Sequence, residues 1–436
     1  MRSIDELAGP RRLPVIGNAH QIRPSRIHLI GERWCAQYGP VFRYDLGRRP
    51  VVGVADLDEI NTILRARPGS FRRWGQIEAL ARETGTYGVF SAEGEDWRRQ
   101  RRLAVTALNA DHLDRYFFVI RRAAERLRTG LNRQASVGGC VDVRSHLKAF
   151  TVEVVSALAF GEDLAGYDRN GELRGDIDRV FAMAGRRFGL PFAYWRYVKL
   201  PADRAFDRSL DRLRAIVGRF IVKARAEMTA RPELFDRPEN FLQGMLAAQA
   251  LDGRYSEEEL FGNSLVMLLA GEDTTAATLG WTVWYVSRHP EVQARLAAEA
   301  DEVLGEAGVP IDHETTAELR YTEAVIREAL RLRAPSPFIA LEALTDTQIA
   351  DIRVPSGTGV ALFTRYATNQ SATFPDARAF SPERWLNGNN GKADRTKASL
   401  AFGAGPRFCP RRNLALLEAK VALATVVRNF RLAPDP

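Results

Sequence analysis

A glycine-rich segment near the end of the chain places one cysteine directly before a helical pattern: Phe402-Gly403-Ala404-Gly405-Pro406-Arg407-Phe408-Cys409-Pro410. Glycines let the backbone turn tightly and approach a flat ligand closely. A cysteine beside Arg407 and near a helix N-terminus has its thiolate favoured by the cation and by the helix dipole. A thiolate is a soft metal ligand, and as the axial ligand of haem iron it favours O–O cleavage. Taken alone, the segment also fits a thiol nucleophile or a merely buried cysteine, although none of the six histidines is a convincing partner for a nucleophile.

Cysteine content and charge exclude several classes of protein. Cys35, Cys140 and Cys409 are too few and too far apart for a disulfide framework or a C-x-x-C zinc or redox motif, so we expect three reduced thiols in the cytoplasm. The 436 residues carry a net charge of +8, with 62 basic residues interspersed among 54 acidic ones. A nucleic-acid-binding protein usually concentrates its positive charge, so we expect no nucleic-acid partner.

No targeting or membrane-spanning segment is expected. The first ten residues are polar and are not followed by an apolar signal-peptide core. The most apolar long stretch, residues 261–286, contains Glu272 and Asp273 at its middle, where a charge in lipid would cost several kcal/mol. This stretch is therefore predicted to be a buried helix, not a membrane span.

Hydrophobic periodicity predicts a mainly α-helical protein with a minor β region. Helical spacing dominates residues 111–248. Ser256 followed by Glu259 is a capping-box signature for a long helix that ends at about His289-Pro290. Other predicted elements are a β-hairpin over 41–54, helices over 147–160, 315–333 and 413–429, strands within 338–366, and a loop over 387–398. With no repeat and no long linker, residues 1–436 are expected to form one domain.

The cysteine segment resembles the haem-binding signature of the cytochrome P450 superfamily, Phe-Gly-x-Gly-x-Arg-x-Cys-x-Gly, and the chain resembles a bacterial, soluble haem-thiolate monooxygenase. The resemblance implies a P450-like fold with haem b between the long central helix and the helix after Cys409. It also implies that Phe402, Gly405 and Arg407 contact the haem and that the Cys409 thiolate ligates the iron. The match departs at Arg411, where the family has glycine, so this side chain either points outward or perturbs the haem.

Ala270-Gly271-Glu272-Asp273-Thr274-Thr275 lies midway along the long helix. Glycine and hydroxyl residues loosen the helical hydrogen-bond ladder and can open a local bulge. In the resembling enzymes this bulge faces the haem, which implies that Thr274 hydrogen-bonds the oxygen and that Asp273 belongs to the proton relay. The alternative is a kink in a buried helix with no catalytic role.

Two further motifs match the family. Glu328-x-x-Arg331 is a helical i,i+3 pair, and Arg384 follows at the spacing expected before the cysteine loop. The resemblance implies that these three residues form a buried ionic triad that braces the haem's proximal side.

Trp97 and Arg101 lie four residues apart on an early helix, as in the family's Trp-x-x-x-Arg motif. The resemblance implies that Arg101 and Arg407 pair with the haem propionates and that Trp97 donates to one of them; an ordinary basic helix face is the alternative. Another propionate-binding arginine of the family falls on Glu342 here, so that role is not carried over.

The implied reaction is insertion of one oxygen atom from O2 into a hydrophobic small molecule. No flavin or nicotinamide domain fits beside this fold, so electrons are expected from a ferredoxin or flavodoxin with an NAD(P)H-dependent reductase. A basic patch for such an acidic partner is expected at Arg98, Arg99, Arg102, Arg411 and Arg412, unless these residues form only a solvated face.

By family position, the substrate pocket is expected to include Phe90, Leu269, Ala270, Phe338 and Ile339, which are apolar. Residues 181–197, rich in aromatics and arginine, form either a lid over the access channel or an ordinary helix-pair core. Relatives usually continue after the cysteine helix into a β-hairpin that lines the pocket, and that hairpin is expected to be missing because the sequence ends at Pro436.

Two other classes of function stay open at the level of sequence. A peroxygenase or isomerase of the same fold would need no reductase, although such enzymes tend to lack the Asp273/Thr274 pair. A haem-binding protein that has lost catalysis is favoured only by Arg411 and by the short C-terminal region.

Overall fold

The computed structural model describes residues 1–107, 110–162, 172–188, 190, 192–253, 255–386 and 399–434. The loop expected over 387–398 lies outside these residues. The helices described are α1 (Ile27–Tyr38), α2 (Leu57–Arg65), α3 (Gly75–Glu83), α4 (Gly94–Ala107), α5 (Ala110–Val137), α6 (Val143–Phe160), α7 (Glu172–Phe188), α8 (Pro201–Ala230), α9 (Phe241–Asp252), α10 (Glu257–Val286), α11 (Pro290–Leu304), α12 (Arg320–Leu332), α13 (Thr364–Thr368) and α15 (Arg412–Asn429). The strands are β1 (Arg2–Ser3), β2 (Val41–Leu46), β3 (Arg49–Val54), β4 (Phe71–Arg73), β5 (Ile339–Ala343), β6 (Thr347–Ile349), β7 (Ile352–Val354) and β8 (Gly359–Leu362).

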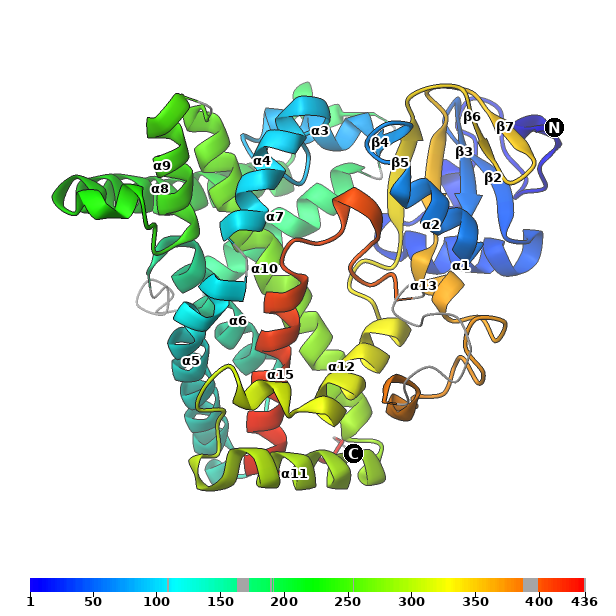
Figure 1. Ribbon diagram of the computed structural model, residues 1–436. Helices are drawn as coiled ribbons and strands as arrows, with labels where there is room; N and C mark the ends of the chain where they lie inside the picture. The colour runs from blue at the N-terminus through cyan, green and yellow to red at the C-terminus, as the bar shows by residue number, and fades with distance from the viewer. Residues whose placement is uncertain are drawn as a thin grey trace.

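Figure 1 shows the strands gathered with α1 and α2 on one side of the molecule and the long helices on the other. The larger sheet has the order β2-β3-β8-β5-β4, and the smaller has the order β1-β7-β6. β2 and β3 form the predicted antiparallel hairpin, and β3 pairs in parallel with β8. The two strand regions predicted at 41–54 and within 338–366 are confirmed: β2 and β3 of the first join β5 and β8 of the second in the larger sheet, whereas β6 and β7 belong to the smaller sheet.

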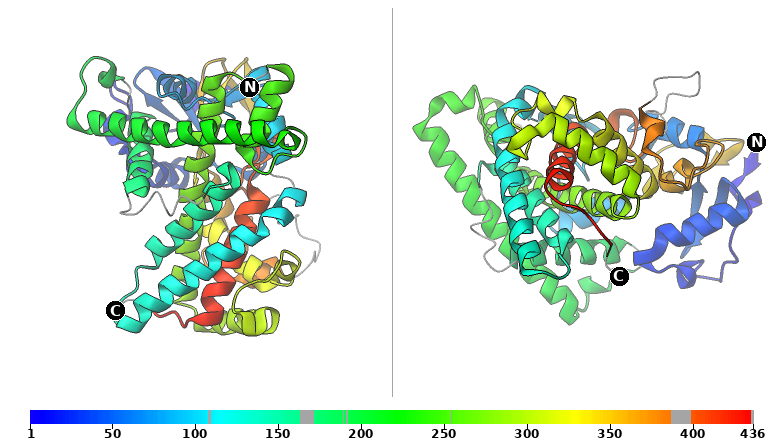
Figure 2. Two further views of the ribbon diagram at one scale, coloured as in Figure 1. Left: turned by 90° about the vertical axis from the view of Figure 1, so that its left-hand side faces the viewer. Right: turned by 90° about the horizontal axis from the view of Figure 1, so that it is seen from below.

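Helix α10 passes through the helical part and packs against α6, α12 and α15 (Figures 1 and 2). Its N-terminus is confirmed: Ser256 and Glu259 form the capping box. It ends at Val286, slightly before the predicted end, and Pro290 starts α11. The expected bulge is absent, because α10 is α-helical from Glu257 to Val286.

The main core lies where α5, α6, α10 and α15 meet. Val154, Leu268 and Val421, from three of these helices, are fully buried. Each such side chain contributes about 1.5–3 kcal/mol through burial, so the core holds α10 and α15 together firmly. Within the described residues, no helix combines the length and the low charge content that crossing a bilayer requires.

The helix predicted from residue 315 starts later, at Arg320. Thr315–Ala317 is instead a separate 3-10 turn. Glu299 of α11 accepts hydrogen bonds from the backbone N–H groups of Tyr321 and Thr322, at 2.6 and 2.8 Å, and so caps α12. The prediction was wrong at this end because the cap comes from another helix.

Candidate functional site

Cys409 lies between a short 3-10 turn, η10 (Gly405–Arg407), and α15. Its backbone N–H donates to the carbonyl of Phe402 at 2.9 Å, which closes the loop. Gly405 has φ +67°, and a Cβ there would lie 2.4 Å from the Leu64 carbonyl oxygen of α2. Only glycine allows this approach, so the glycine in the motif fixes where the loop meets α2. Burial raises the pKa of the Cys409 thiol, and the backbone N–H and guanidinium of Arg411 oppose that rise.

Four arginines gather beside this loop around one carboxylate. Arg407 donates to Glu93 at 2.6 Å, and Arg67, Arg73 and Arg101 complete the group. Burial lowers the pKa of Arg67 to about 10, and it lowers the pKa of Arg73 well below its ordinary value; in both cases the charge of Arg407 adds to the effect. One carboxylate cannot balance four cations, so the cluster attracts further negative charge.

Several donors in this cluster have no acceptor among the described residues: Arg67 Nε and Nη2, Arg73 Nε, Arg101 Nη2 and Arg407 Nε. Leaving buried donors unpaired is costly, and cationic donors are best satisfied by carboxylates. Haem b carries two propionate carboxylates and takes a thiolate as axial ligand. The residues present therefore fit the haem that the resemblance implies, with the arginines toward its carboxylates and Cys409 toward its iron.

Trp97 lies on α4 together with Arg101 and also contacts this arginine cluster. The Arg407 guanidinium lies 4.7 Å from the ring centroid of Trp97, and the Arg101 guanidinium lies 4.7 Å from that of Phe408. Trp97 is buried, whereas Phe408 is 40% exposed. The structure thus brings Trp97, Arg101, Arg407 and the Cys409 loop together; their roles toward haem stay predictions.

One face of α10 is exposed near the middle of the helix. Ala270 and Thr274 are exposed, although the surrounding helix is largely buried. The Thr274 hydroxyl donates to the Ala270 carbonyl at 2.8 Å, and Thr278 bonds the Thr274 carbonyl in the same way. Asp273 points to Lys148 of α6, whose Nζ lies 3.8 Å from Asp273 Oδ1. Thr274 and Asp273 therefore occupy neighbouring but different faces of the helix.

Glu328, Arg331 and Arg384 lie together in a buried ionic group. Glu328 Oε1 accepts from Arg331 Nη2 at 2.7 Å and from Arg384 Nε at 2.9 Å. Its Oε2 accepts from Arg331 Nε and from the indole of Trp385, both at 2.9 Å. With its fork-like donors, Arg331 also bonds backbone carbonyls of the segment before Arg384. The group thus ties α12 to the chain that leads to the cysteine loop.

Arg411 does not belong to the basic patch that the sequence suggested. It is 7% exposed and donates from Nη2 to Glu418 Oε1 at 3.0 Å. The guanidinium lies against α10 at Gly271, where a Cβ would come within 1.8 Å of Arg411 Nη1. Of the two alternatives for Arg411, the outward orientation is wrong, because a buried carboxylate and the space beside a glycine accommodate its side chain inside the protein.

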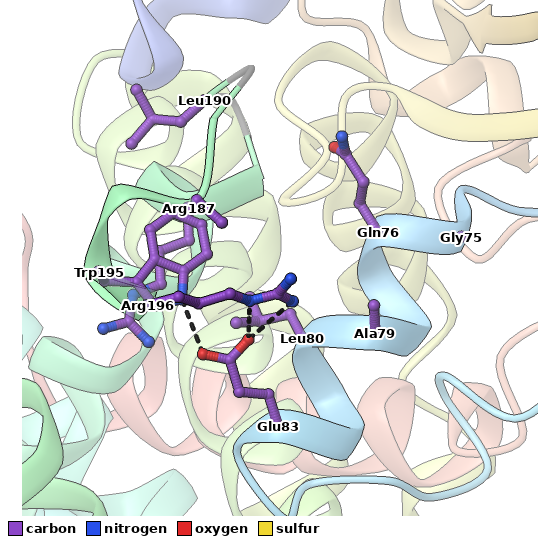
Figure 3. A pocket seen from close by; sticks show the side chains of 10 residues that line it. Gly75, Gln76, Ala79, Leu80, Glu83, Arg187, Leu190, Trp195 and Arg196 are labelled. Carbon is purple, nitrogen blue, oxygen red and sulfur yellow. Dashed lines mark hydrogen bonds and ion pairs between the residues drawn. The ribbon is translucent and has the colours of Figure 1, made fainter.

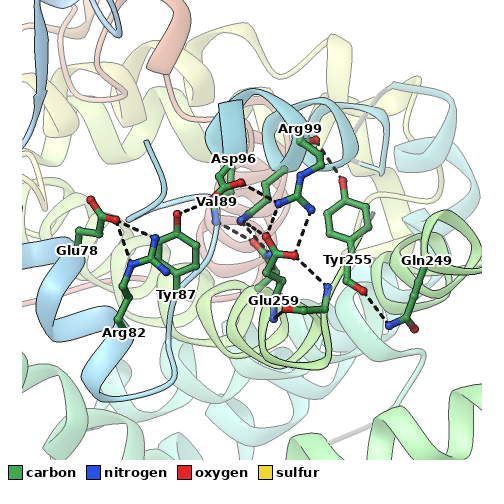
Figure 4. A network of polar contacts seen from close by, with 12 residues as sticks. Glu78, Arg82, Tyr87, Val89, Asp96, Arg99, Gln249, Tyr255 and Glu259 are labelled. Atoms are coloured by element: carbon green, nitrogen blue, oxygen red, sulfur yellow. Dashed lines mark hydrogen bonds and ion pairs between the residues drawn. The ribbon is translucent and has the colours of Figure 1, made fainter. Parts of the chain in front are cut away.

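Arg99 is likewise engaged within the protein, as Figure 4 shows. It donates to Glu259 at the start of α10 at 2.5 Å and to Asp96 at 3.1 Å, and the Tyr255 hydroxyl donates to its carbonyl at 3.1 Å. These contacts connect α4 to α10, and Arg99 is not part of an open basic face. Arg98, Arg102 and Arg412 are exposed, and Arg98 forms an ion pair with Glu95.

Glu342, for which no haem role is expected, links strand β5 to β3 and β4 within the larger sheet. It forms ion pairs with Arg49 and, at 2.5 Å, with Arg72. It therefore has cationic partners of its own in the sheet region.

The residues expected around the substrate divide into two groups. Phe90 is 46% exposed and stacks under the Arg73 guanidinium at 3.8 Å, and Ala270 is exposed. Phe338 and Ile339 are half-buried against the sheet. Leu269, by contrast, is buried in the main helical core.

A cavity of about 320 Å³ lies between α3 and the chain around η5 (Tyr194–Arg196), as Figure 3 shows. Glu83, at the end of α3, accepts from the Trp195 indole at 2.8 Å and from Arg196 at 3.0 and 3.1 Å. This contact closes one side of the cavity. Residues 192–197, within the segment for which a lid was one interpretation, therefore meet α3 through a polar contact.

Sequence reasoning missed several of these residues. Arg67, Arg73 and Glu83 carry no motif, and their partners are far away in the sequence. Glu418 could have been found, because it lies two helical turns after Arg411 and so shares a face with it. Glu272 was noted only as a charge that argues against a membrane span.

Comparisons with known proteins give one consistent family. Residues 7–436 match the family model described as Cytochrome P450. The 25-hydroxyvitamin D-1 alpha hydroxylase, mitochondrial, of Mus musculus is 29% identical over 100% of this chain and 88% of its own. Cyclooctatin synthase of Streptomyces melanosporofaciens is 28% identical over 98% of this chain and 90% of its own, and pentalenene oxygenase of Streptomyces avermitilis is 27% identical over 98% and 91%. Both animal and bacterial proteins are similar to this chain, so the likeness does not single out a bacterial group.

Proposed function

Because this chain belongs to the cytochrome P450 family of haem-thiolate oxidoreductases, we propose that it inserts one oxygen atom from O2 into a hydrophobic small molecule, with Cys409 as the iron ligand. The observation that carries this proposal is the Cys409 loop beside buried arginines whose donors lack acceptors. The haem would supply O2 activation, and its thiolate ligand would promote O–O cleavage.

The residues of the chain would bind and orient the cofactor. Arg67, Arg101 and Arg407 would hold its carboxylates, which accounts for their unpaired donors. The backbone N–H of Arg411 next to Cys409 would help to keep the sulfur anionic. Arg411, which stands where the family motif has glycine, pairs with Glu418 inside the protein. This buried pairing accommodates the replacement and so supports an active enzyme.

Proton delivery would come from α10. Thr274 lies on the exposed face, and its hydroxyl oxygen keeps lone pairs for a water molecule while it donates to Ala270. Asp273, the residue before Thr274, lies on the side of Lys148 and would hold the proton to be delivered.

Electrons would come from a ferredoxin or flavodoxin served by an NAD(P)H-dependent reductase. Arg98, Arg102 and Arg412 are exposed cations, and they support docking of an acidic partner on the surface near α4 and the start of α15. Turnover is expected to fall steeply with salt, because exposed charges are screened beyond about 10 Å at 0.1 M ionic strength.

The first test is spectroscopic. Purified, reduced holoprotein exposed to carbon monoxide is expected to show the red-shifted Soret band of thiolate ligation, and Cys409→Ser is expected to lose it. A wild-type protein without this band would contradict the proposal. The ferric protein is then mixed in turn with each of a panel of apolar compounds, including pentalenene and 25-hydroxyvitamin D. The compound that gives the largest high-spin shift in the absorption spectrum is used in the later tests.

The second test concerns Thr274. With that compound and a ferredoxin system, Thr274→Ala is expected to consume NADPH and release peroxide in place of product. Thr278→Ala is the matched control, since it removes the same hydroxyl-to-carbonyl bond at a buried position. Equal coupling in both variants would remove Thr274 from the relay.

A further inference from the structure

Lys148 lies among three carboxylates from two helices. Its Nζ donates to Asp178 of α7 at 2.5 Å and lies 3.7 Å from Glu272 and 3.8 Å from Asp273, both on α10. The Lys148 side chain is 10% exposed, whereas Asp178 is 56% exposed. The group therefore extends from the surface at Asp178 to the part of α10 that precedes Thr274.

Glu272 is the unusual member of this group. Its side chain is fully buried, and neither carboxylate oxygen accepts a hydrogen bond among the described residues. Asp273, one residue further, is 44% exposed. Burial raises the pKa of Glu272 to about 7; Asp273 and Asp178 add to that rise, while Lys148 opposes it.

A purely stabilising ion pair is a poor explanation for this arrangement. A buried carboxylate needs close and well-directed partners to offset its desolvation, and the single cation here lies 3.7 Å away without a hydrogen bond. A buried carboxyl group that exchanges a proton near neutral pH, next to a relay residue, suits general acid–base work instead.

We propose that Glu272 is a second proton-holding residue of the site, which returns a proton to Asp273 after Asp273 has given one up, and that Lys148 positions both carboxyl groups. The proton leaves the Glu272 carboxyl and joins the Asp273 carboxylate, which leaves Glu272 anionic beside Lys148. Glu272 then regains a proton from solvent on the side of the group where Asp178 is exposed. This inference rests on the proposed function, because it assigns a source to the proton that Asp273 delivers.

The protonation of Glu272 is tested without turnover. Infrared spectra of the ferric holoprotein, titrated from pH 5 to pH 9, are expected to show a protonated-carboxyl band that disappears near pH 7. Glu272→Gln is expected to remove this band, while Glu418→Gln removes a separate one, since the pKa of Glu418 is also raised to about 7 by burial. Lys148→Met is expected to move the Glu272 band to higher pH. An unchanged spectrum in Glu272→Gln would overturn the inference.

The role of Glu272 is tested by measuring how the rate of product formation depends on pH. With the compound of largest high-spin shift, Glu272→Gln is expected to lower the rate of product formation by a factor of roughly 100, the low end for loss of a general acid, and to change its pH profile near pH 7. Glu272→Asp is expected to restore part of the rate. Glu153→Gln on α6 is the control, because Glu153 is a buried, ion-paired carboxylate away from this group.

The outcomes separate the two proposals. A wild-type protein that forms product while Glu272→Gln keeps its rate and pH profile contradicts the inference and leaves the proposed function standing. A wild-type protein that forms no product with any compound or redox partner contradicts the proposed function. If Glu272→Gln does not fold, the titrations of the wild type and of Lys148→Met test the inference instead. A carboxyl band that disappears at the same pH in both proteins contradicts the inference.

Discussion

Arg411 and Glu418 form a buried ion pair along one face of α15, with 3.0 Å between Arg411 Nη2 and Glu418 Oε1. The guanidinium also fills the space that Gly271 leaves on α10. The residue that departs from the family motif therefore connects the helix after the cysteine to the helix that carries Asp273 and Thr274. Gly271, which is distant in the sequence from Arg411 and Glu418, therefore depends on this pair for its packing.

Gly271→Ala is expected to destabilise the protein. The new Cβ would lie 1.8 Å from Arg411 Nη1 and 2.6 Å from Val155 Cγ2, and overpacking of this kind costs about 1–3 kcal/mol. In an Arg411→Gly background the cost is expected to be smaller but not zero, because Val155 remains. Urea unfolding of the four proteins measures this coupling.

Gly280→Ala is the matched control for this experiment. Gly280 lies on the same helix, and a Cβ there meets nothing within 4 Å. Alanine is a better helix former than glycine by about 1 kcal/mol, so this variant is expected to be neutral or more stable. Equal costs of Gly271→Ala with and without Arg411 would show that the guanidinium does not occupy this space.

Glu418 is expected to make stability depend on pH. Burial raises its pKa from the ordinary value near 4.5 to about 7, so the folded protein binds a proton there that the unfolded chain releases. This contribution is complete below about pH 4.5 and is lost as the pH rises to about 7, with a size on the order of 3 kcal/mol. Relative to Glu418→Gln, the holoprotein's free energy of unfolding should therefore fall between pH 4.5 and pH 8. A difference that is constant with pH would contradict the shifted pKa.

Much of the architecture could be predicted because it depends on neighbours in the sequence. The capping box at Ser256, the hairpin of β2 and β3, and the loop around Cys409 each arise from residues within a turn or two. Their spacing alone indicates the backbone conformation, and the glycines indicate where the chain turns.

The predictions that were wrong concern side chains whose partners lie far away in the sequence. Arg99 looks like part of a basic face, but its guanidinium pairs with Glu259 of another helix and is only 22% exposed. Arg411 looks like an intrusion, but Gly271 gives it room. The start of α12 is set by Glu299 of α11. A local pattern cannot show which distant carboxylate will meet a cation, because tertiary packing decides it.

Glu328→Ala is expected to abolish stable haem incorporation. The carboxylate accepts from Arg331, Arg384 and Trp385, and Arg331 is almost fully buried. Removing one partner of a buried ion pair costs about 3–5 kcal/mol, because the remaining cation stays buried. Haem content per folded protein and the thermal midpoint measure the effect.

Glu125→Ala serves as its control. Glu125 pairs with Arg121 on α5, and both side chains are 43% exposed. Exposed pairs of this kind contribute about 1 kcal/mol or less, so haem content should not change. Full haem occupancy in Glu328→Ala would show that the triad is not needed to hold the proximal side.

Glu83→Gln is expected to speed entry of ligands. The Glu83 carboxylate joins α3 to Trp195 and Arg196 across one side of the 320 Å³ cavity. Glutamine keeps the size of the side chain but loses the charge that holds Arg196, and a partly exposed pair contributes about 1 kcal/mol or less, so the gain is roughly two- to five-fold. Stopped-flow absorption with 4-phenylimidazole measures the association rate. Glu78→Gln is the control, because Glu78 pairs with Arg82 on the same helix and does not line the cavity. Equal association rates in wild type and Glu83→Gln would mean that ligands do not pass between α3 and Trp195.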